Sequence, residues 1–206
     1  MKQLVLLACA VALFSCVDKS GRATSHQVDV HDSALLKKEP ANPYVPVDVS
    51  PMDMLYYPTD YPVKKMNGEA KDLPFARVIY SRPHRGGRTL FGALVQWGQP
   101  WRLGANEATE IEFFQPATIQ KKRIEKGRYI LYAIPYEDKW ILVLNNSLFS
   151  WGLKLNPKAD VARFEVPSGK TPQLIEYFTM DFEKTSTGVD LLMAWENTEV
   201  RLPIQF

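Results

Sequence analysis

The residues best suited to chemistry lie close together between positions 101 and 110. Arg102 carries a guanidinium group, which can hold a carboxylate or a phosphate through two parallel hydrogen bonds. Glu107 and Glu110 can act as a general base, or as an acid and base pair if their carboxyl groups lie about 5–9 Å apart, as in glycosidases. The structural alternative is that Arg102 pairs with a glutamate while Asn106 binds the backbone of the turn.

A second group is basic and surrounds Gly86-Gly87. Arg82, His84, Arg85 and Arg88 form an anion site if the glycines let this loop fold around a ligand, and a solvated basic turn if they do not. His84 is the only histidine after residue 50, whereas a histidine-rich catalytic metal site generally needs two or three. We therefore expect no metal and no cofactor.

Aromatic side chains form the third group. Trp97 and Trp101 flank the turn Gly98-Gln99-Pro100, where one of them can be exposed and stack on a sugar ring; the alternative is packing in the core. We assign no catalytic residue. The candidate ligand-binding residues are Arg82, His84, Arg88, Trp101, Arg102, Asn106, Glu107 and Glu110.

Short strands must position these residues. Thr198, Val200, Leu202 and Ile204 alternate with more polar neighbours, and residues 128–134 are apolar enough for a strand buried on both faces. Alternation with aromatic and β-branched enrichment is typical of strands. The pattern predicts an all-β fold, an antiparallel β-sandwich of roughly 8–10 strands, with a closed β-barrel as the alternative.

Turn signals divide these strands. Glycine-containing or polar clusters at residues 125–127, 136–138, 168–170 and 186–188 each predict a break between two strands, the first of them a hairpin turn. The pattern allows one helical turn, near residues 145–151.

The N-terminus has the pattern of an export signal. Lys2 precedes an apolar run at residues 4–14, which is too short to span a bilayer and ends at Ser15-Cys16. This arrangement resembles the bacterial lipoprotein signal, in which the cysteine is lipidated; an ordinary signal peptide with an incidental cysteine is the alternative. We expect a signal peptide at residues 1–15, a lipidated Cys16 that binds the membrane, and a tether to residue 50 that spans about 30 Å as a coil.

A single domain is expected over residues 51–206, and it contains no cysteine. The domain must therefore be stable through its own core, without a disulfide bond. The formal net charge of the chain is only +2, which gives no electrostatic reason to expect a nucleic-acid partner.

Several motifs together resemble one bacterial family. They include Tyr80-Ser81-Arg82-Pro83, Lys126-Gly127-Arg128-Tyr129, Trp151-Gly152, Trp195-Glu196-Asn197-Thr198 and the long run from Trp101-Arg102 to Thr109-Glu110. The family is domain of unknown function 2911, and the resemblance covers residues 75–204. It implies an exported protein, often a lipoprotein of Bacteroidota, and we expect an outer-membrane location on either the periplasmic face or the cell surface.

The chain departs from the family pattern at two places. Leu103 stands where the family usually has threonine, and Leu153-Lys154-Leu155 replaces a segment that usually contains tyrosine. If that segment shapes a pocket, this chain is expected to bind a different ligand from its relatives.

Three hypotheses for function remain. We favour a non-enzymatic, lipid-anchored module that presents residues 97–110 to a glycan, a peptide or an envelope protein, because the sequence has no recognisable nucleophile–base pair, metal cluster or nucleotide-binding loop. The second is a hydrolase of envelope or imported polymers that uses Glu107 and Glu110 with Arg102. The third is a purely structural envelope protein.

Overall fold

The structure, a computed structural model, describes residues 48–206. The expected signal peptide, the lipidation site Cys16 and most of the tether therefore lie outside the described residues. Within the described part there are nine strands, one α-helix and a 3-10 turn at Pro157–Ala159. The bounds are β1 (Met52–Tyr57), α1 (Tyr61–Met66), β2 (Ala76–Ser81), β3 (Glu110–Phe113), β4 (Ala117–Ile119), β5 (Lys122–Ile124), β6 (Gly127–Pro135), β7 (Lys139–Asn145), β8 (Asp160–Lys184) and β9 (Val189–Ile204).

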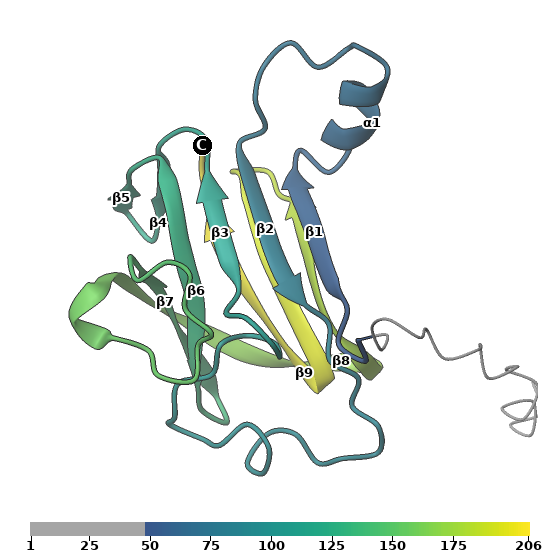
Figure 1. The fold of residues 1–206 in the computed structure, drawn as a ribbon, viewed down its shortest axis with the longest axis vertical. Helices are drawn as coiled ribbons and strands as arrows, with labels where there is room; N and C mark the ends of the chain where they lie inside the picture. Colours follow the sequence, from purple (N-terminus) through teal and green to yellow (C-terminus); the bar gives the residue numbers. More distant parts are fainter. Residues whose placement is uncertain (1–47) are drawn as a thin grey trace, which may run out of the picture. The chain divides into compact units, whose positions relative to one another are not determined.

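Seven of the strands form one antiparallel sheet in the order β1-β2-β3-β6-β7-β8-β9, and β4 and β5 form a separate hairpin. The sheet curls into a half-barrel, with β8 and β9 behind β1, β2 and β3 in Figure 1. The predicted all-β fold is confirmed. The half-barrel is compatible with both the sandwich and the barrel that the sequence left open.

The curl follows from the length of β8, which has 25 residues. A straight strand of that length would measure about 80 Å, whereas a domain of this size is roughly 40 Å across. The strand therefore bends, and it changes partner along its length. Its first part pairs with β7 through residues such as Phe164 and Val166, and its last part pairs with β9 through Met180 and Phe182.

The apolar core fills the concave side of the half-barrel. Its buried side chains come from residues 76–204, so Val47–Phe206, which forms one compact unit, holds the whole of the described core. In β6 the four residues from Ile130 to Ala133 are all buried, as predicted for a strand covered on both faces. No helix within residues 48–206 is long and apolar enough to cross a membrane.

One bulge explains a change of phase in the sequence pattern of β9. Apart from Ala194, buried residues fall on odd numbers up to Trp195 and on even numbers from Thr198 onward. Between them Glu196 has a positive φ of 56°, where the pairing with β8 is irregular. A β-bulge turns the same face of the strand back to the core, so residues 189–195 and 198–204, which alternate in opposite phase, form one strand.

The turn predictions had mixed outcomes. Residues 136–138 and 186–188 do connect antiparallel neighbours, β6 with β7 and β8 with β9. The predicted break at residues 168–170 is wrong, because β8 continues through it while its partner changes from β7 to β9. Residues 125–127 do not form a hairpin turn, because β5 pairs with β4 and β6 pairs with β3 and β7. The helix lies at Tyr61–Met66 and not at residues 145–151.

A buried polar network fixes the loop between β7 and β8. Asp160 accepts hydrogen bonds from the Tyr132 hydroxyl at 3.0 Å, from Asn145 Nδ2 at 2.7 Å and from Arg163 Nη2 at 2.6 Å. Asn145 also donates to the Asn156 carbonyl at 2.8 Å, which closes the base of the loop. Burial, assisted by the hydrogen bond to the carboxylate, raises the pKa of Tyr132 to about 12.

Replacement of Tyr132 tests this network. We expect Tyr132→Phe to lower the free energy of unfolding by about 1–2 kcal/mol at pH 7, because Asp160 loses a buried donor. Since the folded-state pKa is raised, the wild type loses stability as the pH rises from about 10 towards 12, and the variant lacks that loss. Urea unfolding at several pH values should show that the difference in free energy of unfolding between the two proteins shrinks above pH 10. A difference that stays constant with pH would contradict the raised pKa of Tyr132.

Candidate functional site

The connection from β2 to β3, residues 82–109, closes the lower end of the half-barrel (Figure 1). Its first part is held to β8, because Arg85 N donates to the Glu176 carbonyl at 2.8 Å and Pro83 O accepts from Phe178 N at 3.1 Å. Its last part is held to β6, because Trp101 N and Ala133 O are 2.7 Å apart. The connection is therefore tied to strands on both sides of the half-barrel.

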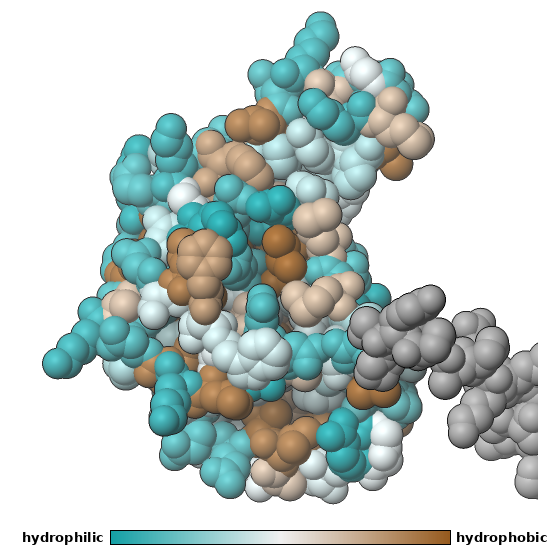
Figure 2. All heavy atoms as spheres, viewed as in Figure 1, coloured by the Kyte–Doolittle hydropathy of each residue, from teal (hydrophilic) through white to brown (hydrophobic). Residues whose placement is uncertain are grey.

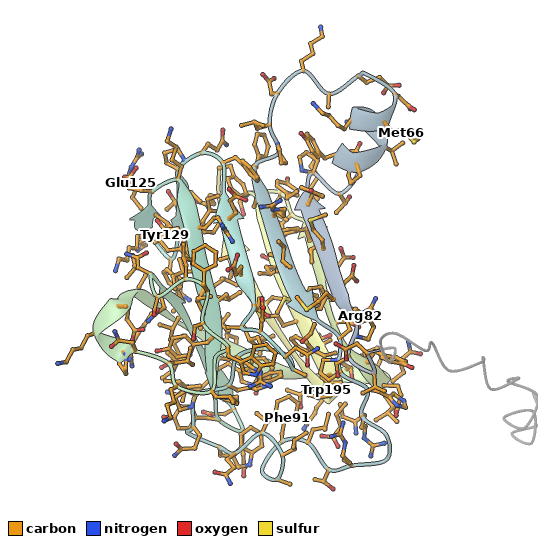
Figure 3. The ribbon with its side chains drawn as sticks, in the orientation of Figure 1. Met66, Arg82, Phe91, Glu125, Tyr129 and Trp195 are labelled. Atoms are coloured by element: carbon orange, nitrogen blue, oxygen red, sulfur yellow. The ribbon has the colours of Figure 1, made fainter. Side chains whose placement is uncertain are left out.

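Aromatic packing holds the centre of this connection. The ring of Trp101 stacks on Trp195 of β9 at 5.9 Å between centroids and lies 5.1 Å from Phe178 of β8 and 5.6 Å from Trp140 of β7. Trp101 is only partly buried, whereas the other three rings are fully buried. Figure 3 shows Phe91 of the connection and Trp195 together at this end. Part of the Trp101 ring therefore packs in the core, and the rest of the ring is not covered by the domain.

A cavity of about 700 Å³ lies on the uncovered side of Trp101. This volume suits a small organic ligand. The cavity takes its lining from the segment before β1, from the β2–β3 connection, from the β7–β8 loop and from β9. Four of the predicted ligand-binding residues line it: His84, Arg88, Trp101 and Arg102.

Arg102 is the unusual group in the lining. Its Nε is buried without a hydrogen-bond partner, and the described residues supply no carboxylate to its guanidinium. Burial lowers the pKa of Arg102, but a guanidinium remains protonated throughout the physiological range. The positive charge of Arg102 therefore has no counter-charge in the described chain, and it lines the cavity together with the aromatic surfaces of Trp101 and Trp195.

The other two basic side chains of the lining, Arg88 and His84, do have partners, unlike Arg102. Arg88 donates to the carbonyl oxygens of His84 and Arg85 and forms no ion pair within residues 48–206. His84 Nε2 lies 2.9 Å from the Glu176 carboxylate, and its ring stacks on Tyr177 at 4.6 Å. The cavity therefore has two cations without an acidic partner in the described chain, Arg88 and Arg102.

The β7–β8 loop positions Arg102. Gly152 has a φ of +80°, and a Cβ placed on it would lie 2.7 Å from Cβ of Arg102 and 2.9 Å from Cβ of Ala108. Ala108 N also donates to the Ser150 carbonyl at 3.3 Å. The glycine lets this loop pack directly on the arginine stem, and the next residue, Leu153, lines the cavity.

The other predicted site residues lie outside the cavity lining. Arg82 joins β1 to β8, with its guanidinium 3.1 Å from Asp53 and 3.3 Å from Thr179 Oγ1. Asn106 donates to the Asp48 carboxylate and the Ser50 carbonyl, so these two residues of the expected tether lie against the domain. Asn106 thus binds the segment before β1, and not the backbone of its own turn, which was the alternative to ligand binding.

The two glutamates are not brought together at the cavity. Glu110 is paired with Arg128 on the face of the sheet that points away from the core, whereas its neighbour Ile111 is buried. Glu107 is exposed and does not line the cavity. Within residues 48–206 no group of three or more metal-ligating side chains occurs.

Sequence reasoning missed the exposed aliphatic part of the lining, which comes from Val49, Leu94 and Leu153. Single exposed aliphatic residues carry no motif, so Val49 and Leu94 gave no signal. The departure from the family pattern at Leu153 was the one available signal, and that residue does lie at the cavity.

Residues 62–204 match the model of a family described as "Protein of unknown function (DUF2911)". No curated protein and no solved structure matches the chain.

Substitution of Gly152 tests the packing against Arg102. Gly68 is a matched control, because its φ of +74° is similar but its Cβ position has no neighbour within 4 Å. Gly68→Ala should cost about 1 kcal/mol, the strain of a positive φ. Gly152→Ala should cost at least about 1 kcal/mol more, because Arg102 must move. Thermal or urea unfolding measures both, and equal losses would contradict the packing.

Proposed function

The chain belongs to the DUF2911 family of proteins of unknown function, and we propose that its cavity binds a small organic anion with an apolar body, without converting it chemically. The single observation that carries the proposal is Arg102, whose guanidinium lines the cavity and has no carboxylate partner in the described chain. Buried polar groups are almost always hydrogen-bonded. Arg77 Nε and Trp140 Nε1 are also buried without a partner, but Arg102 is the one of these three residues that lines the cavity, where a ligand can supply an acceptor to its guanidinium.

The remaining lining determines the rest of the ligand. Trp101, Trp195 and Leu153 offer apolar and aromatic surface, and Arg88 adds a second cation. A carboxylate or phosphate can pair with a guanidinium through two hydrogen bonds, while an alkyl or aromatic body would cover the tryptophan and leucine surfaces. A purely polar glycan would leave that apolar surface uncovered.

The hydrolase hypothesis is less well supported. It requires Glu107 and Glu110 beside Arg102, but Glu110 is paired with Arg128 and neither glutamate lines the cavity. A purely structural role is also less well supported, because it gives no reason for an unpaired arginine at a cavity of this size.

The proposal places this module in the cell envelope. Acylation of Cys16 would anchor the chain to a membrane, most simply the outer membrane of the bacterium, and the domain would sample ligands near that surface. The support is the apolar run at residues 4–14 followed by Ser15-Cys16.

Ligand binding is tested with octyl phosphate and the neutral octyl glucoside, by calorimetry on the domain Val47–Phe206. Arg102→Met keeps the aliphatic stem and removes the charge. We expect it to weaken octyl phosphate binding at least about tenfold, the effect of losing a charge-assisted hydrogen bond. The matched control is Arg123→Met, because Arg123 lies on β5, outside the cavity lining, and pairs with Glu125 at 2.8 Å.

Two results would refute the binding proposal. One is octyl glucoside binding as tightly as octyl phosphate. The other is an Arg102→Met variant that folds normally and binds octyl phosphate as the Arg123→Met control does.

Anchoring is tested separately on the full chain, expressed in a bacterium that exports lipoproteins. Intact-mass analysis of the membrane fraction should find acyl chains on Cys16, and Cys16→Ser should move the protein to the soluble fraction, because one acylated residue supplies the membrane affinity. An unacylated wild-type protein would exclude this part of the proposal.

A further inference from the structure

Three aliphatic side chains of the cavity lining are exposed to an unusual extent. Val49 is 83% exposed, Leu153 is 74% exposed and Leu94 is 55% exposed. They come from three separate segments: the residues before β1, the β7–β8 loop and the β2–β3 connection. We refer to Val49, Leu94 and Leu153 as the aliphatic rim. Apolar groups exposed together in this way mark an interaction surface.

The aliphatic rim lines the same cavity as the cations described above. Arg88 and Arg102 line the same cavity and have no acidic partner within residues 48–206. Two acids beside the cavity-lining segments are paired with other residues: Glu176 pairs with His84 and Arg85, and Asp48 accepts from Asn106. Apolar groups around unpaired guanidinium groups complement a surface in which phosphates lie above acyl chains.

The chain itself enters the domain at this point. Val49 and Ser50 line the cavity, and residues 17–47 connect them to Cys16. An anchor on Cys16 would therefore be joined through residues 17–47 to the segment that lines the cavity. Figure 2 shows apolar side chains gathered at the lower end of the face in view, which is the end that the β2–β3 connection closes.

We infer that the cavity entrance docks on an anionic phospholipid surface, with the aliphatic rim in the interfacial layer and Arg88 and Arg102 on a lipid phosphate. This inference rests on the proposed function, because the same cavity receives the anion. It adds that the ligand is presented by a bilayer and that the rim is part of its recognition. A soluble anion with an apolar body would satisfy Arg102 and cover Leu153, but it would leave Val49 and Leu94 in water.

The test is co-sedimentation of the domain Val47–Phe206 with vesicles, so that neither an acyl anchor nor the signal segment contributes. This domain holds the whole of the described core. One vesicle preparation is phosphatidylcholine alone and the other contains phosphatidylglycerol as well. We expect preferential binding to the anionic vesicles, weakened about tenfold by Leu153→Ser or Leu94→Ser, since each buried leucine contributes roughly that factor.

A leucine elsewhere supplies the matched control. Leu73 is 66% exposed and precedes β2, whereas the cavity-lining connection follows β2, so the two lie at opposite ends of that strand. Leu73→Ser should leave vesicle binding unchanged. Arg102→Met should weaken binding to anionic vesicles about fivefold more than Arg123→Met, which removes the same charge outside the cavity lining.

The outcomes separate this inference from the proposed function. Octyl phosphate binding without vesicle binding overturns the docking inference and leaves the ligand site intact. Equal losses in Leu153→Ser and Leu73→Ser, or equal binding to neutral and anionic vesicles, also overturn it. If the domain binds neither octyl phosphate nor either type of vesicle, both proposals are overturned.

Discussion

The insertion of Trp101 into the end of the curled sheet is the interaction on which the rest of this site depends. A half-barrel leaves apolar side chains from its concave face open at its ends, and here Trp140, Phe178 and Trp195 come from three different strands. Trp101 covers them from the β2–β3 connection, with ring distances of 5.1 to 5.9 Å. Because aromatic pairs bury large areas and prefer defined geometries, this packing fixes the backbone on which Arg102 is carried.

The arginines of the domain show what distinguishes the cavity from ordinary surface. Arg82 contacts Asp53, Arg128 contacts Glu110 and Arg163 contacts Asp160, so each has a carboxylate that balances its charge. Arg102 has none among the described residues, although its Nε is buried. The β7–β8 loop holds it there through Gly152, and the Asp160 network holds that loop. The unpaired arginine is thus supported by a rigid shell, as a binding site requires.

The strands could be predicted from the sequence because alternation is a local property. The alternation within β9 was found on both sides of Glu196, but as two separate segments, because the irregular backbone at Glu196 changes the phase of burial. The break predicted at Ser168-Gly169 was wrong for a physical reason: a glycine and a serine mark a place where a strand bends as well as a place where it ends. Only the pairing partners, β7 before this point and β9 after it, distinguish the two cases.

The sequence alone determined an all-β domain, the family to which it belongs and two polar loops, near Arg82 and near Arg102, as candidate sites, because each rests on residues close together in the chain. The sequence could not determine which of these charged residues would form an ion pair with another residue of the domain. Whether Glu110 faces Arg102 or Arg128 depends on strand pairing. Val49 and Leu153 line one cavity only because the sheet curls and brings distant loops to one end. The tertiary structure decided the site because its unpaired charge and its aliphatic rim are properties of neighbours in space.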